Sequence, residues 1–183
     1  MSRALMFLLL AVASGFAGDE QAVSRKLESR VDEYLDLRKK ATQDLPPLKP
    51  KVEPEQIQAH KNALAKAIVQ MRSGARQGDI LDSEIAAYLR TLVTAEMTGA
   101  SGKPARETAK QGNPAAGESP QPVTVRVNAV YPDSAPASTV PATLLLRFPK
   151  LPKSVDFRFV GRDLVLRDVD AGLILDFVSN VVP

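Results

Sequence analysis

Residues 155–178 constrain the fold most strongly, because three short apolar runs alternate there with polar and charged residues at a period of two. Turn residues separate the runs, and the pattern predicts three antiparallel strands joined by tight turns. The large apolar side chains of such a meander gather on one face. The segment therefore predicts a small sheet that packs against other parts of the chain.

The first turn is predicted at Gly161-Arg162, where glycine supplies the positive φ that a type II′ turn needs at its first central position. This turn sets three cross-strand pairs: Phe159 with Leu164, Phe157 with Leu166, and the oppositely charged Asp156 with Arg167. In the third strand, residues 173–178, strict alternation puts Leu173, Leu175 and Phe177 on one face and Ile174, Asp176 and Val178 on the other. The register of the second turn is left open.

Three helices are predicted before the sheet. Residues 18–43 form a long amphipathic helix, with an apolar stripe of Val23, Leu27, Val31 and Tyr34. Residues 54–98 form two helices, the first starting at Pro54 and the second capped by Asp79 or Asp82. A short loop containing glycine joins these two, so we expect an antiparallel helical hairpin that covers the sheet.

The remaining segments are predicted as linkers and further strands. Residues 44–53 hold three prolines, with a fourth directly after them at Pro54, and form a Pro-rich linker. Residues 99–122 form a flexible linker rich in Gly, Pro, Ser and Ala. In residues 123–183, the β-rich region, strands are also expected at 123–127 and 144–148. The fold class is therefore α+β, in one domain with a mainly antiparallel sheet of about five strands.

Residues 1–17 have the pattern of a signal peptide. Arg3 gives a positive start, an apolar run covers residues 4–12, and small residues flank Phe16. Cleavage is expected after Ala17, with Gly15 as the alternative. The apolar run is shorter than the roughly 20 residues of a membrane-spanning helix. We therefore expect an exported protein, periplasmic or extracellular, with no stable membrane span after cleavage.

Composition excludes several kinds of chemistry. The chain has no cysteine, which excludes disulfides, thiolate metal sites and thiol catalysis, and one histidine, which excludes a multi-histidine metal site within one chain. The net charge of +3 is spread over the sequence. Without a basic stripe or an aromatic stacking platform, nucleic-acid binding is not expected.

Three residue groups were weighed as sites, and each has an ordinary structural interpretation. His60 lies near the apolar side of a predicted helix, and no serine of the chain stands in an elbow motif. Asp168 and Asp170 have the spacing of the first two ligands of a calcium-binding loop. The twelfth position of that loop, which needs a bidentate glutamate, is Ser179, so a turn between strands is favoured. Ser138 lies in a Pro-rich loop without a nearby general base. No catalytic, cofactor-binding or metal-binding residue is assigned.

Several stretches resemble a family of small exported proteins of unknown function from environmental bacteria. The matching pieces are Gln77-Gly78-Asp79-Ile80, Val127-Asn128, Tyr131-Pro132, Ser138-Thr139-Val140-Pro141, Arg158-Phe159-Val160-Gly161-Arg162, Leu166-Arg167-Asp168 and Leu173-Ile174-Leu175-Asp176-Phe177. The resemblance implies export and a shared architecture. It implies no activity, cofactor or catalytic residue.

The leading functional prediction is a non-catalytic periplasmic or secreted interaction module. Its partner would be another exported protein that contacts the first helix, although packing of that helix on its own domain is the simpler interpretation. The alternative is a small hydrolase that uses two carboxylates, which requires two acids about 5 to 9.5 Å apart in a cleft. No cofactor is predicted for either function.

Overall fold

The computed structural model describes residues 11–43, 45–47, 53–100, 102–111, 113, 123–136 and 138–183. Helices precede a three-stranded antiparallel sheet of order β1-β2-β3, which confirms the α+β class. The helices are α1 (Ala11–Gln43), α2 (Pro54–Met71), α3 (Ser83–Thr98), α4 (Gly102–Lys110) and α5 (Ala142–Leu145). The strands are β1 (Val155–Val160), β2 (Asp163–Asp168) and β3 (Leu173–Val178).

The predicted β1–β2 hairpin is confirmed residue by residue. Phe159 pairs with Leu164, Phe157 with Leu166, and Asp156 with Arg167. The φ angle of Gly161 is 61°, and that of Arg162 is negative. A positive φ followed by a negative one is the signature of the type II′ turn, so glycine at this position has a conformational cause.

Strand β3 departs from the strict alternation that the sequence predicts. A bulge lies opposite Leu166 and Arg167, because Leu166 pairs with Asp176 while Arg167 pairs with Ile174. Leu175 and Asp176 consequently both face the helices. Phe177 turns to the other face, with Ile174, and Val178 joins the helix-facing core.

Asp176 explains this bulge. Its carboxylate is fully buried and accepts hydrogen bonds from the backbone N–H groups of Gly78, Ile80 and Leu81, at 2.8 to 3.1 Å. A buried carboxylate is stable only with such partners. The donors lie about a hundred residues before β3, on the loop that joins α2 to α3.

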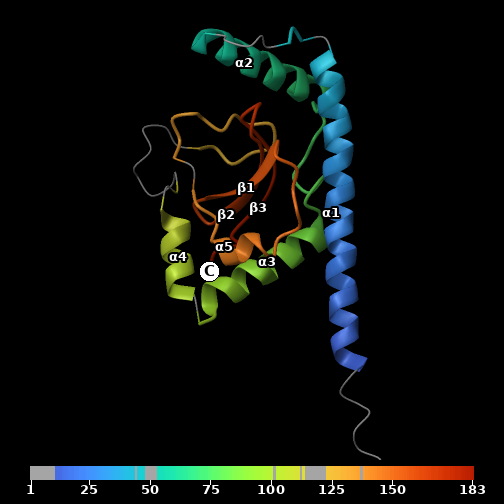
Figure 1. Ribbon diagram of the computed structural model, residues 1–183, viewed down its shortest axis with the longest axis vertical. Coiled ribbons are helices and arrows are strands. Elements are labelled where there is room, and N and C mark those ends of the chain that lie inside the picture. Colours follow the sequence, from blue (N-terminus) through green and yellow to red (C-terminus); the bar gives the residue numbers. More distant parts are fainter. Residues whose placement is uncertain are drawn as a thin grey trace, which may run out of the picture.

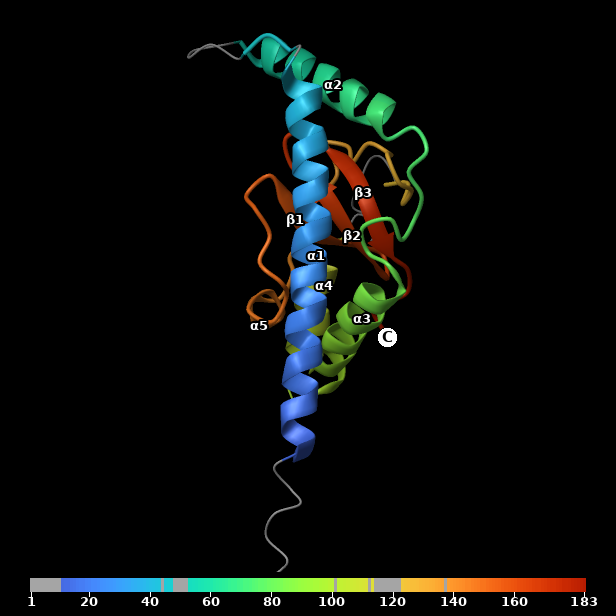
Figure 2. The ribbon, with the colours of Figure 1, turned by 90° about the vertical axis from the view of Figure 1, so that its right-hand side faces the viewer.

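The long helix α1 runs along one side of the domain, and α2 and α3 lie towards opposite ends of it (Figure 1). The view turned by 90° shows the same arrangement (Figure 2). The apolar stripe of α1 is covered by the rest of the domain, because Val23, Leu27, Val31 and Tyr34 are all buried. The apolar face of α1 therefore packs on its own domain, which was the simpler of the two interpretations of this helix.

Helix α2 packs against α1, and α3 packs against α4 and α1 rather than against α2, so the expected antiparallel hairpin between α2 and α3 is not formed. The physical reason lies in the loop that joins them. Arg72 donates to the backbone oxygen of Leu175 at 2.9 Å, and the amides of residues 78–81 bind Asp176. These bonds draw the loop onto β3 and separate the two helices. As predicted, α2 starts at Pro54; α3 is capped by Asp82, one of the two acids considered.

The two additional strands are absent from the described part of the chain, so its sheet has three strands rather than about five. Residues 144–148 begin in α5 and continue as a turn, in which the amide of Phe148 donates to the oxygen of Leu144. The side chains of Leu144 and Phe148 are both buried. Val123 and Val125 pack against the outer face of the sheet without joining a ladder. After them, Asn128, with a φ of 63°, redirects the chain.

Helix α4 occupies part of the segment predicted as a flexible linker. Ala105 and Ala109, four residues apart, are buried against α3, which gives this short helix an apolar face. Residues 101, 112 and 114–122 of that predicted linker lie outside the described residues, as do residues 44 and 48–52 of the Pro-rich one.

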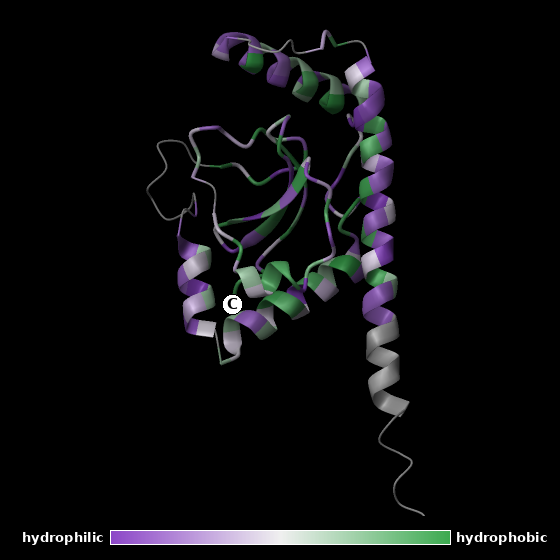
Figure 3. Cartoon of the chain, in the orientation of Figure 1, coloured by the Kyte–Doolittle hydropathy of each residue, from purple (hydrophilic) through white to green (hydrophobic). Residues whose placement is uncertain are grey.

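Hydrophobic residues concentrate where α3 and α5 meet beside the sheet, whereas α1 is mostly hydrophilic with apolar residues recurring along it (Figure 3). Residues 1–10 of the predicted signal peptide lie outside the described residues. Within the part of the chain that is described, no helix is both long and apolar enough to cross a membrane.

Candidate functional site

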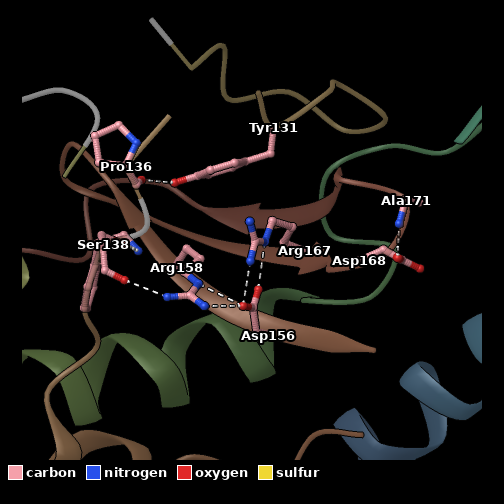
Figure 4. Close-up of polar contacts among 9 residues, drawn as sticks. Tyr131, Pro136, Ser138, Asp156, Arg158, Arg167, Asp168 and Ala171 are labelled. Atoms are coloured by element: carbon pink, nitrogen blue, oxygen red, sulfur yellow. Dashed lines mark hydrogen bonds and ion pairs between the residues drawn. The ribbon is translucent and has the colours of Figure 1, made fainter. Parts of the chain in front are cut away.

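The outer face of β1 and β2 carries a cluster of one carboxylate and two guanidinium groups (Figure 4). Asp156 accepts hydrogen bonds from Arg167 at 2.9 and 3.0 Å and from Nε of Arg158 at 2.8 Å. The sequence predicts the pair with Arg167, because these residues face each other across the hairpin. Arg158 joins from two residues further along β1.

This cluster fixes the loop that passes beside β1. Arg158 donates to the backbone oxygen of Ser138 at 3.0 Å, and the guanidinium of Arg167 lies 4.8 Å from the ring centroid of Tyr131. Tyr131 in turn donates its hydroxyl to the backbone oxygen of Pro136 at 2.8 Å. These contacts, visible in Figure 4, hold the loop against the sheet.

Beside the cluster lies a pocket of about 510 Å³, which we call the β1-edge pocket. It is lined by Thr139 and Val140, Leu145, residues 148–151 and residues 155–158. Residues of the connection from α5 to β1 form one wall. This connection runs on the side of the sheet away from β3 (Figure 2). Most of the lining is apolar, and the charged groups are Lys150, Asp156 and Arg158.

The backbone of β1 contributes to this pocket because β1 is an edge strand. In a hairpin closed by a two-residue turn, alternate residues point both backbone groups away from the partner strand. In β1 these residues are Val155, Phe157 and Phe159. Such outward groups need partners wherever water is excluded.

Three outward amides along this edge are satisfied by the protein. The N–H of Val155 donates to the oxygen of Pro152 at 3.0 Å, and that of Phe159 to Oγ of Ser138 at 2.7 Å. Just past the strand, the side chain of Asn113 bonds both backbone groups of Gly161, at 2.7 and 2.9 Å. Within the described residues, the N–H of Phe157 has no such partner, and Phe157 lines the pocket.

The chemistry that the pocket offers is that of binding. Among the described residues no group bonds the N–H or the C=O of Phe157, so the pocket presents a backbone donor and acceptor beside two cationic side chains and an apolar wall. Its single lining carboxylate, Asp156, is bonded to two guanidinium groups, and no histidine lines it. The two facing carboxylates that the hydrolase alternative requires are not found in this pocket, and that alternative stays a prediction.

Ser138 and His60, two residues weighed from sequence, are separated by the fold. The Ser138 side chain is fully buried, and its Oγ accepts the amide of Phe159, which gives this serine a structural role. His60 lies half-buried on α2, at the end of the domain away from α5 (Figure 1). The structure therefore does not bring the histidine to the β1-edge pocket.

The residues that resemble a calcium loop form the turn between β2 and β3, as favoured from sequence. Asp168 is fully buried and accepts hydrogen bonds from Tyr34 at 2.5 Å, Arg38 at 2.8 Å and the amide of Ala171 at 2.7 Å. Asp170 also accepts from Arg38, at 2.5 Å. Burial and the Asp168 carboxylate raise the pKa of Tyr34 well above its usual value, so this hydroxyl stays protonated.

This turn therefore attaches α1 to the sheet. Its carboxylates are used by groups of the protein itself, and Ser179 lies beyond β3. Among the described residues, no group of three or more His, Cys, Asp or Glu side chains is placed to hold a metal ion.

The sequence interpretation missed the β1-edge pocket, because the residues that form its wall were expected to be a strand. Leu144 and Phe148 are four residues apart, a spacing that fits a helical turn, and Pro141 and Pro149 bracket them. This was the available signal. Nothing local indicates that Phe157 keeps an unpaired amide.

Comparisons with protein-family models, with curated proteins and with solved structures give no match for this chain. The resemblance to small exported proteins stays a prediction. The geometry of the pocket is therefore the basis for a functional proposal.

Proposed function

We propose that the protein is an exported, non-catalytic interaction module and that the β1-edge pocket is its binding site. The observation that carries this proposal is the backbone of Phe157, which has no hydrogen-bond partner among the described residues and lines a pocket with an apolar wall. Natural sheets usually protect their edges, and an edge left open is a common place for another chain to add.

The other edge of the same sheet supports this proposal by contrast. Along β3, the backbone groups of Gly172 and Ile174 are bonded to residues 128–131, and the oxygens of Leu175 and Phe177 to side chains of residues 72 and 77. An edge covered in this way has no room for a partner. Of the two sheet edges in the described part of the chain, β1 is the one that keeps an open position.

Contact through α1 is the less favoured part of the earlier prediction. Its apolar stripe is buried in the domain, so a partner of α1 would meet the charged face of the helix. Exposed charged pairs contribute little to affinity, about 0 to 1 kcal/mol each. The β1-edge pocket offers apolar surface and backbone hydrogen bonds instead.

Photo-crosslinking in the cell that exports the protein tests the binding site. A benzophenone amino acid is placed at Leu146, which is 86% exposed and adjacent to the pocket residue Leu145, and in a matched variant at the exposed Gln58 of α2. We expect a discrete crosslinked product from position 146 and none from position 58. Equal products from both positions, or none from 146, would reject the pocket as the binding site.

Export is tested separately by fractionation and by N-terminal sequencing of the isolated protein. The signal-like pattern of residues 1–17 and the resemblance to exported proteins support this part of the proposal. We expect a chain that starts at Gly18, or at Phe16 if cleavage follows Gly15. A protein that retains Met1 and stays in the cytoplasmic fraction would contradict export and leave the pocket proposal intact.

A further inference from the structure

We infer that the β1-edge pocket binds an extended acidic peptide segment of another protein, which adds to β1 at Phe157. This inference rests on the proposed binding role of the pocket and names the class of its partner. The backbone pattern, the size of the opening and the surrounding charge each support it.

The backbone pattern favours an extended chain. Phe157 directs both its N–H and its C=O away from β2, and a single residue of an added antiparallel strand can exchange two hydrogen bonds with it. On one side Ser138 already satisfies Phe159, and on the other Pro152 satisfies Val155. The free stretch therefore has room for a short peptide rather than a full strand.

The apolar wall favours a peptide with one apolar side chain directed into the pocket. Leu145, Phe148 and Leu151 line the opening opposite the strand, and Phe148 packs edge-on against Phe157 with ring centroids 5.0 Å apart. In an extended chain, alternate side chains point to opposite sides. An apolar residue that enters this pocket is thus followed by residues that face the rim.

The charge around the pocket favours acidic residues at those flanking positions. Residues 139–158 contain one acid, Asp156, which two arginines already bind, and four basic residues, Arg147, Lys150, Lys153 and Arg158. Arg147, Lys150 and Lys153 are exposed. Complementary charge at a rim speeds association and selects partners.

The same charges disfavour a second copy of this chain as the occupant. Pairing β1 with β1 of another copy would bring two basic rims together, and such like-charge contacts are costly. Charged side chains at a sheet edge disfavour self-association, and β1 carries Arg158 while Lys150 and Lys153 precede it. An acidic peptide would convert this repulsion into attraction.

Three synthetic heptapeptides test the inference by fluorescence anisotropy with the full chain. The first alternates glutamate and valine, the second alternates lysine and valine, and the third is the first with its central valine N-methylated. We expect the acidic peptide to bind at least about tenfold more tightly than the basic one at low salt, with the difference decreasing as salt is added. N-methylation removes one backbone donor and should weaken binding about fivefold.

A pair of variants and one amide locate the bound peptide. Lys150→Glu should weaken binding of the acidic peptide about three- to tenfold. Lys40→Glu, the same charge change on an exposed residue of α1, should leave the affinity within about twofold. By NMR, the amide of Phe157 should exchange more slowly when the peptide is added, while that of Ile174, already bonded to Ala129, should not change.

Each other outcome overturns the inference. These are equal binding of acidic and basic peptides, no binding of either, an unchanged Phe157 amide, or a dimer whose crosslink at Leu146 joins two copies of this chain. If Leu146 instead crosslinks to a different protein while the acidic peptide fails to bind, the pocket remains the binding site and only the class of partner is wrong. Failure of both experiments would reject the proposed function itself.

Discussion

The two edges of the sheet differ in how their backbone groups are hydrogen-bonded. Along β3, successive residues bond to backbone groups and long side chains of other segments, whereas along β1 only some of the outward amides are bonded. Ile174 exchanges hydrogen bonds with the chain at Asn128 and Ala129, at 2.8 and 2.9 Å, and Gly172 accepts from Tyr131 at 2.7 Å. Along the β1 edge, one carbonyl and two side chains serve the outward amides of Val155, Phe159 and Gly161, while the amide of Phe157 has no partner among the described residues.

The difference separates an edge that is bonded along its length from an edge that keeps an open position. The cover of β3 also anchors the α2–α3 loop through Arg72, so removing it would disturb the domain. The cover of β1 consists of contacts that each serve one residue, which allows one position to stay free without loss of the rest. Changes on the two edges should therefore have different consequences.

The largest effect is expected for Arg72→Met on the β3 edge. Arg72 is 8% exposed, donates to the oxygen of Leu175 at 2.9 Å and to the side chain of Asn128, and lies over the Tyr34 ring. Losing these bonds leaves a buried carbonyl unsatisfied, which should cost about 3 kcal/mol of unfolding free energy. Urea denaturation measures this. Arg76→Met, at an exposed position four residues later, is the control and should change stability by less than about 0.5 kcal/mol.

The amides of Phe157 and Ile174 compare the two edges directly by hydrogen exchange. Ile174 donates to Ala129 at 2.9 Å, while Phe157 has no partner within the described residues. Exchange at Phe157 should be at least about a hundredfold faster, which corresponds to about 2.7 kcal/mol of opening free energy. Equal protection of both amides in the free protein would show that the β1 edge is also closed.

Ser138→Ala should widen the open stretch on β1. The variant removes the acceptor for the buried amide of Phe159 and should lower the unfolding free energy by about 2 kcal/mol. The matched control is Thr139→Ala at the next, exposed position, which should be nearly neutral. A neutral Ser138→Ala would mean that water or a rearranged loop satisfies Phe159, and that the edge is less ordered than its contacts suggest.

The smallest of these effects is expected at the end of β1, for Gly161→Val. The φ of 61° at Gly161 is unfavourable for a β-branched residue, and the cost should be about 1 kcal/mol or more. Thermal unfolding measures it. Gly74→Val is a suitable control, because Gly74 has no positive φ and no atom lies within 4 Å of an added Cβ. Equal melting temperatures for both variants would remove the conformational argument for glycine in this turn.

The hairpin could be predicted from sequence because its information is local. A glycine turn and the alternation of residues 155–168 fix the register together, and the Asp156–Arg167 pair follows from it. Helices α1, α2 and α3 could also be recognised, since the apolar periodicity of α1, the proline that begins α2 and the acid that caps α3 are local features.

The bulge and the pocket could not be predicted because their causes lie far away in the chain. Asp176 faces the helices because the amides that bind its carboxylate belong to residues 78–81. The sequence of β3 itself contains no signal for these distant donors. The segment at 123–127 alternates like a strand, but the β3 edge is taken by the residues that follow it. The free position at Phe157 depends on where Ser138 and Pro152 stop covering the edge.

Asp176 also limits the insertions and deletions that β3 can tolerate. Because its carboxylate fits one set of three amides on the α2–α3 loop, sliding β3 by a single residue would place a charge against the apolar outer face and leave those amides empty. Insertions and deletions of one residue within β3 should therefore prevent the domain from folding. The buried carboxylate thus fixes the register of β3 relative to a loop that lies about a hundred residues earlier in the sequence.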